Sequence, residues 1–238
     1  MNYKIDAYDD FATHYSEMVK KREQAGIEKE PIMPHFLKLL GDIAGLSVLD
    51  AGCGQGYLSR ILASRGAHVT GIDISEKLIQ MAREQDPSHT ISYQVANLCQ
   101  SLPQYSQRFD LVVSHFVLDD VSDYKGFLST LASVMKPSSR LVLSMNNPYS
   151  LVVRGHVRDY FDTGKPVSYR GMAQAGVKVH FYHHTLEEYL DACLAAGLQL
   201  QRLLDIPTPV DRYKFHRDAL MKPGYHFPFF IVLSLLKN

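Results

Sequence analysis

Two acids and three glycines between residues 50 and 73 have types and spacing that suit a nucleoside. The stretch VLDAGCGQG is an apolar run that ends on Asp50 and then places Gly52, Gly54 and Gly56 at every second position. A loop without side chains lets a ligand lie against the backbone, and the N–H groups at the start of the following helix can face it. A second apolar run ends on Asp73, whose carboxylate can accept hydrogen bonds from both hydroxyls of a ribose. The pattern therefore predicts a site for a ligand that contains a nucleoside.

Alternating strand and helix patterns indicate the elements that position these residues. Apolar runs predict seven strands, at 47–50, 68–73, 91–96, 109–114, 140–145, 198–204 and 227–233. Helical periodicity predicts helices at 34–44, 55–65, 123–135 and 187–196, and one more that Ser75 caps. Strands that alternate with helices are typical of a parallel sheet with helices on both faces, which binds ligands at the carboxyl ends of its strands. We expect an α/β fold with a Rossmann-like, seven-stranded, mostly parallel sheet.

The chain of 238 residues is expected to form a single domain. An N-terminal arm covers 1–33, a ligand-binding core covers 34–145, and a helix with two strands covers 185–238. Between them, residues 146–184 interrupt the pattern after the fifth strand. This segment is rich in aromatic and basic residues, and we expect an irregular cap insertion.

Composition argues against several classes of protein. The 25 basic and 25 acidic residues give a formal net charge of zero, which is unlike a protein that binds nucleic acid by neutralising phosphates. No apolar run approaches the ~20 residues that a membrane-spanning helix needs. The polar, acidic N-terminus does not resemble a signal peptide. We expect a cytoplasmic protein, monomeric or homodimeric, that acts on a small molecule.

The metal-ligating residue types do not predict a metal site. An odd number of cysteines without a Cys-x-x-Cys pair is typical of reduced thiols in the cytoplasm. The three cysteines are Cys53, Cys99 and Cys193. His115 with Asp119 and Asp120 could form a metal corner, but we interpret these acids as part of a solvated loop.

The glycine spacing separates two kinds of nucleotide ligand. A dinucleotide fingerprint is G-x-G-x-x-G, whereas this loop is G-x-G-x-G with Asp50 just before it. An acid there would repel a pyrophosphate but attract an ammonium group, which favours S-adenosylmethionine. A short-chain dehydrogenase would also need a Tyr-x-x-x-Lys pair, and none of the 14 tyrosines has lysine four residues later.

Three motifs, VLDAGCGQG, GIDIS and FDLVVSHFVLDDVSD, resemble the class I S-adenosylmethionine-dependent methyltransferases, most closely the small-molecule types 11 and 25. The resemblance covers about residues 45 to 147, and YHHTLEEYLDACLAAGLQL resembles the family's late helix–strand step. It implies in-line transfer of a methyl group to an O, N or C atom of a small organic acceptor, with release of S-adenosylhomocysteine. It also implies that the N-terminal arm is a helical lid.

The resemblance implies a role for particular side chains. The implied cofactor contacts are Tyr15, Asp50, Gly52, Cys53, Gly54, Asp73, Ile74, Asn97, Leu98 and Ser114. Tyr15, on the lid, would reach the methionine carboxylate, and Asp73 would take the ribose hydroxyls. Asn97 stands where the family commonly has the aspartate that contacts the adenine amino group, a contact that its side-chain carbonyl can make.

His115 is the candidate general base, because it follows Ser114 at the end of the fourth strand. A satisfied polar residue at a strand end is an equally good interpretation. The expected substrate contacts are Tyr8, His115, Asn146, Tyr149, Tyr160, Tyr182 and His183. Phe161, Tyr169 and Phe181 are expected to complete an aromatic wall.

Other functions remain open from the sequence. NNPY at 146–149 is similar to the Asn-Pro-Pro-Tyr motif of amino methyltransferases acting on DNA or protein glutamine. It follows the fifth strand rather than the fourth, so we reject a DNA substrate and interpret Pro148 as a strand terminator. The main alternative is an S-adenosylmethionine-binding biosynthetic enzyme that catalyses a non-methylating reaction. A non-catalytic binding protein and a nicotinamide enzyme fit the motifs less well.

Overall fold

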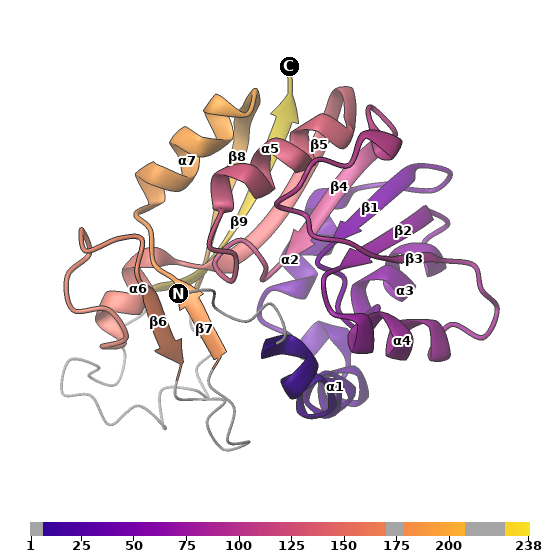
Figure 1. Cartoon of the computed structure of the whole chain (residues 1–238), viewed down its shortest axis with the longest axis horizontal. Helices are drawn as coiled ribbons and strands as arrows, with labels where there is room; N and C mark the ends of the chain where they lie inside the picture. The colour runs from indigo at the N-terminus through magenta and orange to yellow at the C-terminus, as the bar shows by residue number, and fades with distance from the viewer. Residues whose placement is uncertain (1–6, 170–178, 208–226) are drawn as a thin grey trace.

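The computed structural model describes residues 7–169, 179–207 and 227–238 (Figure 1). Its main sheet has seven strands in the order β3-β2-β1-β4-β5-β9-β8. The strands are β1 (Ser47–Ala51), β2 (His68–Asp73), β3 (Ser92–Val95), β4 (Phe109–His115), β5 (Met135–Asn146), β8 (Leu198–Pro207) and β9 (Pro228–Lys237). The first five are parallel, and β9 runs antiparallel to both β5 and β8. The predicted α/β, seven-stranded, mostly parallel sheet is confirmed.

Helices cover both faces of the sheet. They are α2 (Met33–Leu40), α3 (Tyr57–Ser64), α4 (Glu76–Glu84), α5 (Tyr124–Val134) and α7 (Leu186–Ala195). Along β1, Val48 packs with residues of α2, α3 and α4 on one face, while Leu49 packs with residues of α5 and α7 on the other. Both side chains are fully buried, and each such burial contributes about 1.5–3 kcal/mol. This alternation assigns successive side chains of β1 to the two faces of the sheet.

Side-chain caps set the start of two helices, and the first of them, Ser75, is the cap that the sequence predicts. Ser75 Oγ accepts a hydrogen bond from Leu78 N at 3.1 Å at the start of α4. Thr185 and Glu188 form a reciprocal capping box at the start of α7. A cap of this kind stabilises a helix by about 1 kcal/mol.

The strand order changes direction beside β1. The chain builds β1, β2 and β3 outward and then returns to place β4 on the other side of β1. The loops that leave β1 and β4 therefore diverge, and they leave a crevice at the carboxyl edge of the sheet. The glycine loop after β1 and His115 at the end of β4 both lie at this crevice.

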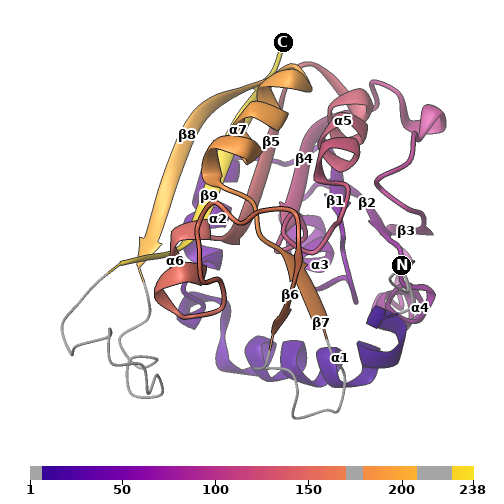
Figure 2. The same ribbon diagram turned by 60° about the vertical axis from the view of Figure 1, so that its left-hand side comes forward.

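Helix α1 (Ala7–Ala25) crosses the carboxyl edge and is joined to the loops there. Ser16 Oγ donates to Gln55 Oε1 of the glycine loop at 2.5 Å, and Glu23 forms an ion pair with Arg60 of α3. A short 3-10 turn, η1 (Ile27–Lys29), links α1 to α2. The N-terminal segment thus lies over the end of β1 where a lid is expected. Figures 1 and 2 show α1 below the sheet, near a small hairpin of the cap.

The prediction that residues 146–184 are irregular is wrong. They form α6 (Pro148–Val153) and the antiparallel pair β6 (Pro166–Tyr169) and β7 (Val179–Tyr182). Asn147 caps α6, because its Oδ1 accepts from Tyr149 N at 3.0 Å, and Pro148 occupies the first turn, where it needs no hydrogen-bond partner. These elements are too short to show a hydrophobic period.

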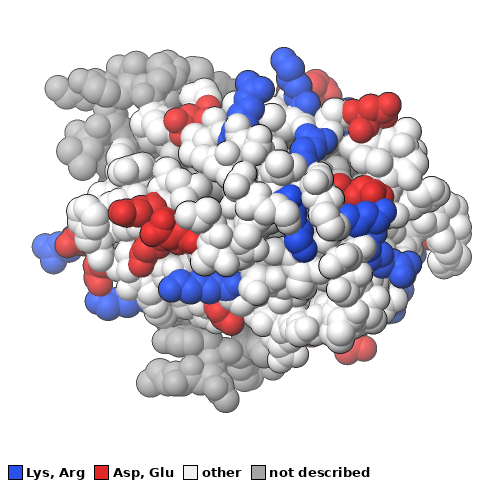
Figure 3. Space-filling model, turned by 90° about the horizontal axis from the view of Figure 1, so that it is seen from above, with Lys and Arg blue, Asp and Glu red and all other residues white. Residues whose placement is uncertain are grey.

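The face in Figure 3 carries no large patch of one sign of charge, because acidic and basic side chains are interspersed on it. Among the described residues, no helix is both long and apolar enough to cross a membrane. A short 3-10 turn, η2 (Pro103–Tyr105), precedes β4.

Candidate active site

The loop after β1 is built so that its backbone is bare and fixed. Gly52 has a φ of +78°, and a Cβ added there would lie 2.3 Å from a methyl group of Val117. No larger residue fits without moving the loop after β4. Both Gly52 N and Cys53 N donate to Ile72 O of β2, at 2.8 and 3.1 Å. The loop is therefore held by the sheet before any ligand is present.

Two acids flank this loop. Asp50 is 1% exposed, and its Oδ2 accepts a hydrogen bond from Ser59 Oγ of α3 at 2.6 Å. Burial raises the pKa of Asp50 to about 7, against the effect of the Ser59 hydrogen bond, which lowers it. Asp73 accepts from Gly54 N at 2.8 Å and from Ser75 N at 2.9 Å. Burial raises the pKa of Asp73 as well, while these main-chain hydrogen bonds lower it.

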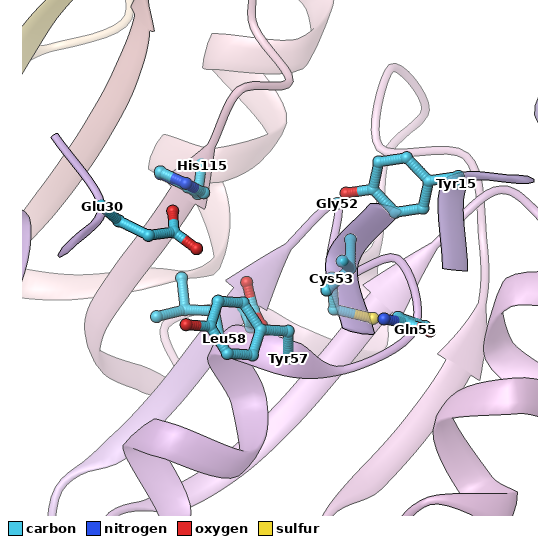
Figure 4. Close-up of a pocket in the computed structure, with 10 residues that line it drawn as sticks. Tyr15, Glu30, Gly52, Cys53, Gln55, Tyr57, Leu58 and His115 are labelled. Atoms are coloured by element: carbon cyan, nitrogen blue, oxygen red, sulfur yellow. The ribbon is translucent and has the colours of Figure 1, made fainter. Parts of the chain in front are cut away.

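A pocket lies between α1, the glycine loop, the start of α3 and the end of β4 (Figure 4). It is lined by Tyr15, Val19, Glu30, Asp50, Gly52, Cys53, Gln55, Tyr57, Leu58 and His115. Its acidic side chains are Glu30 and Asp50, and this lining contains no lysine or arginine. The pocket therefore favours a group that is positively charged.

His115 is fixed in this pocket by contacts to three neighbours. Its Nδ1 is 2.6 Å from Ser144 Oγ, and its ring packs edge-on against Phe36 with 5.4 Å between ring centroids. The next residue, Phe116, has a φ of +58° and lies 4.6 Å from the His115 ring. Such a backbone conformation is uncommon for an aromatic residue, and strain of this kind is found at functional sites.

Asp119 is not part of a solvated loop, so that interpretation is wrong. It is 3% exposed, and its Oδ2 accepts from Asn146 Nδ2 at 2.6 Å. Its carbonyl oxygen accepts from Tyr182 N of the cap at 2.7 Å. Burial raises the pKa of Asp119, and the hydrogen bond from Asn146 and the charge of Arg154 oppose this rise. In the part of the chain that the structure describes, no cluster of His, Cys, Asp or Glu could hold a metal ion.

Comparison with known proteins supports the nucleoside interpretation. Residues 49–143 match a family model described as a methyltransferase domain. Demethylmenaquinone methyltransferase of Tropheryma whipplei is 42% identical over 107 residues, which are 44% of each chain. Ubiquinone biosynthesis O-methyltransferase of Coxiella burnetii is 34% identical over 119 residues, which are 49% of this chain and 50% of that protein. The chain thus spans about half the length of the curated relatives it matches.

A solved structure covers far more of the chain. The S-adenosylmethionine-dependent methyltransferase of Mesorhizobium loti is 25% identical, with a TM-score of 0.72, and covers 89% of this chain and 100% of that one. Residues 49–143 form a methyltransferase domain, and the chain has the fold of the class I S-adenosylmethionine-dependent methyltransferases. Its cofactor is S-adenosylmethionine.

The site brings together six of the ten cofactor contacts expected from the sequence. Tyr15, Asp50, Gly52 and Cys53 line one pocket with His115. Gly54 and Asp73 adjoin it, because they are joined to each other by a hydrogen bond and a Cβ added at Gly54 would lie 3.3 Å from the Tyr15 ring. These residues fit the cofactor: a bare loop and acids suit an ammonium-bearing nucleoside.

The remaining expected cofactor contacts lie farther along the sheet edge. Ile74 follows β2 and is half-buried, and Asn97 follows β3 with its Oδ1 accepting from Cys99 N at 2.9 Å. One lone pair of that oxygen stays available for an adenine amino group. Leu98 is 7% exposed and packs in the core, and Ser114 is 1% exposed with its hydroxyl buried.

Three of the expected substrate contacts, Tyr149, Tyr160 and His183, form an aromatic cluster in the cap. The rings of Tyr149 and Tyr160 stack at 4.5 Å with 4° between their planes. His183 Nε2 is 2.8 Å from Tyr160 O, and the ring is 1% exposed. Neither these residues nor Asn146 and Tyr182 line the pocket.

The other expected substrate residues have varied positions. Phe161 is 79% exposed, whereas Phe181 is buried beside Leu151. Tyr8 lies on α1 and Tyr169 on β6, but their side chains are outside the described part of the structure.

Sequence reasoning missed several residues that line the pocket. Glu30, Tyr57 and Leu58 are among them. Tyr57 and Leu58 begin α3 directly after the glycine loop, so their nearness to a ligand was readable from the motif. Glu30 comes from the connection between α1 and α2, which carries no motif, and only the folded chain brings it to the site.

Proposed function

We propose that this methyltransferase transfers the methyl group of S-adenosylmethionine to a hydroxyl oxygen on a small aromatic acceptor, such as a phenol or hydroquinone. The observation that carries the proposal is the position of His115. This imidazole lines the same pocket as Asp50 and the glycine loop, and its Nδ1 is 2.6 Å from Ser144 Oγ. A hydroxyl must lose its proton to become a strong nucleophile, and a histidine can accept that proton near neutral pH.

The bound cofactor supplies an electrophilic methyl group on a sulfonium. The glycine loop, Asp50 and Asp73 would bind its methionine and ribose parts. His115 would accept the acceptor's proton, and Ser144 would hold the imidazole in place through Nδ1. Holding donor and acceptor in line contributes most to such a reaction, up to ~7–11 kcal/mol of the barrier. The lid helix α1 contributes Tyr15 and Val19 to the pocket wall and would exclude water from it.

An aromatic acceptor suits the surroundings of His115. Phe36 and Phe116 pack against its ring, and Tyr15 and Tyr57 line the pocket. Flat aromatic rings pack favourably on such side chains. One relative is named an O-methyltransferase of ubiquinone biosynthesis and another a demethylmenaquinone methyltransferase, and a reduced quinone is a hydroxylated ring.

A small acceptor also fits the charge of the chain better than nucleic acid does. The formal net charge is zero, and the face in Figure 3 carries both signs of charge. A protein that reads a phosphate backbone normally presents a basic groove.

The experiment is methyl transfer from ¹³C-methyl-labelled S-adenosylmethionine to catechol, hydroquinone and methylhydroquinone, with aniline and benzoate as acceptors of other classes. Mass spectrometry of the products would show a methoxy product from at least one hydroxylated ring and none from aniline or benzoate. Methylation of aniline or benzoate alone would overturn the choice of a hydroxyl acceptor. Binding of S-adenosylhomocysteine with no methylated product in any reaction would favour a non-methylating enzyme instead.

A further inference from the structure

Glu30 belongs to the pocket although it lies outside the matched methyltransferase region. Its backbone N donates to Ile27 O at 3.2 Å, which closes the turn η1. Two residues later the chain is anchored by Ile32 and Met33, which are 2% and 0% exposed. Glu30 is therefore held from both sides, and its carboxylate starts from a fixed backbone position.

The Glu30 side chain enters the pocket from the connection between α1 and α2. Figure 4 shows its carboxylate pointing into the pocket, below His115 and above Tyr57, with Tyr15 and Gln55 at the right of the view. One of its carboxylate oxygens is buried. By contrast, Glu28 lies two residues earlier in the same turn and is exposed. Only one of these two neighbouring acids faces the site.

The charge of the pocket identifies what this acid can bind. Asp50 and Glu30 are its two acids, His115 is its one imidazole, and the lining includes no lysine or arginine. The methionine part of the cofactor carries an α-ammonium group. That group is a cation with three hydrogen-bond donors, and a carboxylate is its strongest partner.

We propose that Glu30 binds the α-ammonium group of S-adenosylmethionine, from the side of the pocket opposite the glycine loop. This inference rests on the assignment of the pocket to the cofactor within the proposed function, and not on the identity of the acceptor. Glu30 is then a cofactor-binding residue supplied by the chain between lid and core, so that cofactor binding and lid position are linked through one carboxylate.

Asp50 alone is poorly suited to neutralise that cation. It is 1% exposed, and its Oδ2 is engaged by Ser59. Because burial raises its pKa to about 7, a large fraction of Asp50 is protonated at neutral pH. A second acid from outside the loop supplies the counter-charge that Asp50 does not fully provide.

The test is calorimetric titration of the full chain with S-adenosylhomocysteine and with its desamino analogue, which lacks only the α-amino group. The variants are Glu30→Gln, which keeps the shape and removes the charge, and Glu28→Gln as the matched control. We expect Glu30→Gln to bind S-adenosylhomocysteine about tenfold or more weakly and to bind the desamino analogue about as well as the wild type does. Glu28→Gln should match the wild type with both ligands.

Three results would overturn the inference. The first is unchanged affinity of Glu30→Gln for S-adenosylhomocysteine, and the second is an equal loss for both ligands, which would mean a structural role. The third is no binding of S-adenosylhomocysteine to the wild type. If Glu30→Gln does not fold, as judged by circular dichroism, Glu30→Asp takes its place and should show a smaller loss that is again specific to the amino group. Because binding is measured without an acceptor, failure of methyl transfer would not affect the result.

Discussion

His115 and Ser144 face each other across β4 and β5, and His115 Nδ1 lies 2.6 Å from Ser144 Oγ. Ser144 is 0% exposed, so its hydroxyl has no access to water. The hydrogen bond holds the Nδ1 edge of the imidazole against the sheet. Sheet register thus orients the group that we assign as the base.

Removing the imidazole tests that assignment. We expect His115→Gln to reduce kcat about 100-fold, because an acceptor hydroxyl would lose its proton acceptor. Affinity for S-adenosylhomocysteine should stay within about twofold, since His115 does not supply the main cofactor contacts. Steady-state kinetics and calorimetry measure the two quantities. A fall in kcat of only a few-fold would return His115 to the role of a satisfied polar residue at a strand end.

Ser144 is expected to act through His115 as a positioning residue. In Ser144→Ala the imidazole loses its Nδ1 partner, and kcat should fall about tenfold while the pH–rate profile shifts. Ser139→Ala is the matched control, because it also removes a hydroxyl from β5, where Ser139 Oγ donates to Lys136 O at 2.6 Å, away from the pocket. If both variants change kcat and the pH profile alike, the Ser144 effect is on stability alone.

Cofactor affinity should depend on pH through Asp50. Burial places the pKa of this carboxyl at about 7, above its ordinary value of 3.8. Below pH 7 the acid is mostly protonated and must release a proton before it can pair with an ammonium group. Affinity for S-adenosylhomocysteine should therefore fall by up to about tenfold for each pH unit below 7 and level off above pH 8.

Calorimetry at several pH values checks this dependence. Asp50→Asn, which has no proton to release, should bind more weakly at pH 8 and show a flatter profile between pH 6 and 8. A wild-type affinity that is constant over this range would contradict a functional role for the raised pKa of Asp50.

Asp119 should stabilise the joint between the sheet and the cap. Asp119→Ala removes the acceptor of the Asn146 amide and leaves that buried donor without its partner. The expected loss is about 1–3 kcal/mol of the free energy of unfolding. Urea unfolding measures it, with the exposed Asp191→Ala of α7 as a control expected to change stability by less than about 0.5 kcal/mol. Equal stability of the two variants would show that the Asp119–Asn146 contact contributes nothing.

The cofactor half of the fold could be predicted from the sequence because its signals are local. Strand β2 begins and ends where the sequence places it, at His68 and Asp73, and the caps Ser75 and Thr185 start the expected helices. Each of these features depends on a short stretch of chain: an apolar run, a capping residue or a glycine at positive φ. The site around Asp50 and Asp73 follows, because adjacent parallel strands bring their carboxyl ends together.

Residues that reach the site or the cap from outside the strand–loop motifs could not be predicted in the same way. Asp119 is buried beside Asn146, which lies 27 residues later in the sequence, and beside Tyr182 of the cap. No local pattern in the sequence indicates either contact. Glu30 reaches the pocket only because α1 crosses the sheet edge before the chain turns into α2. These residues are set by tertiary packing, which overrides the polarity pattern that suggested a solvated loop.

The most direct test of the account is a calorimetric titration of the full chain with S-adenosylhomocysteine, with NAD as the control. The loop with alternating glycines, Asp50 before it and Asp73 at the end of β2 predict one-to-one binding of S-adenosylhomocysteine in the micromolar range and no heat from NAD. Binding of NAD, or no binding of S-adenosylhomocysteine at any concentration tested, would contradict the assignment of this pocket to a methyl donor.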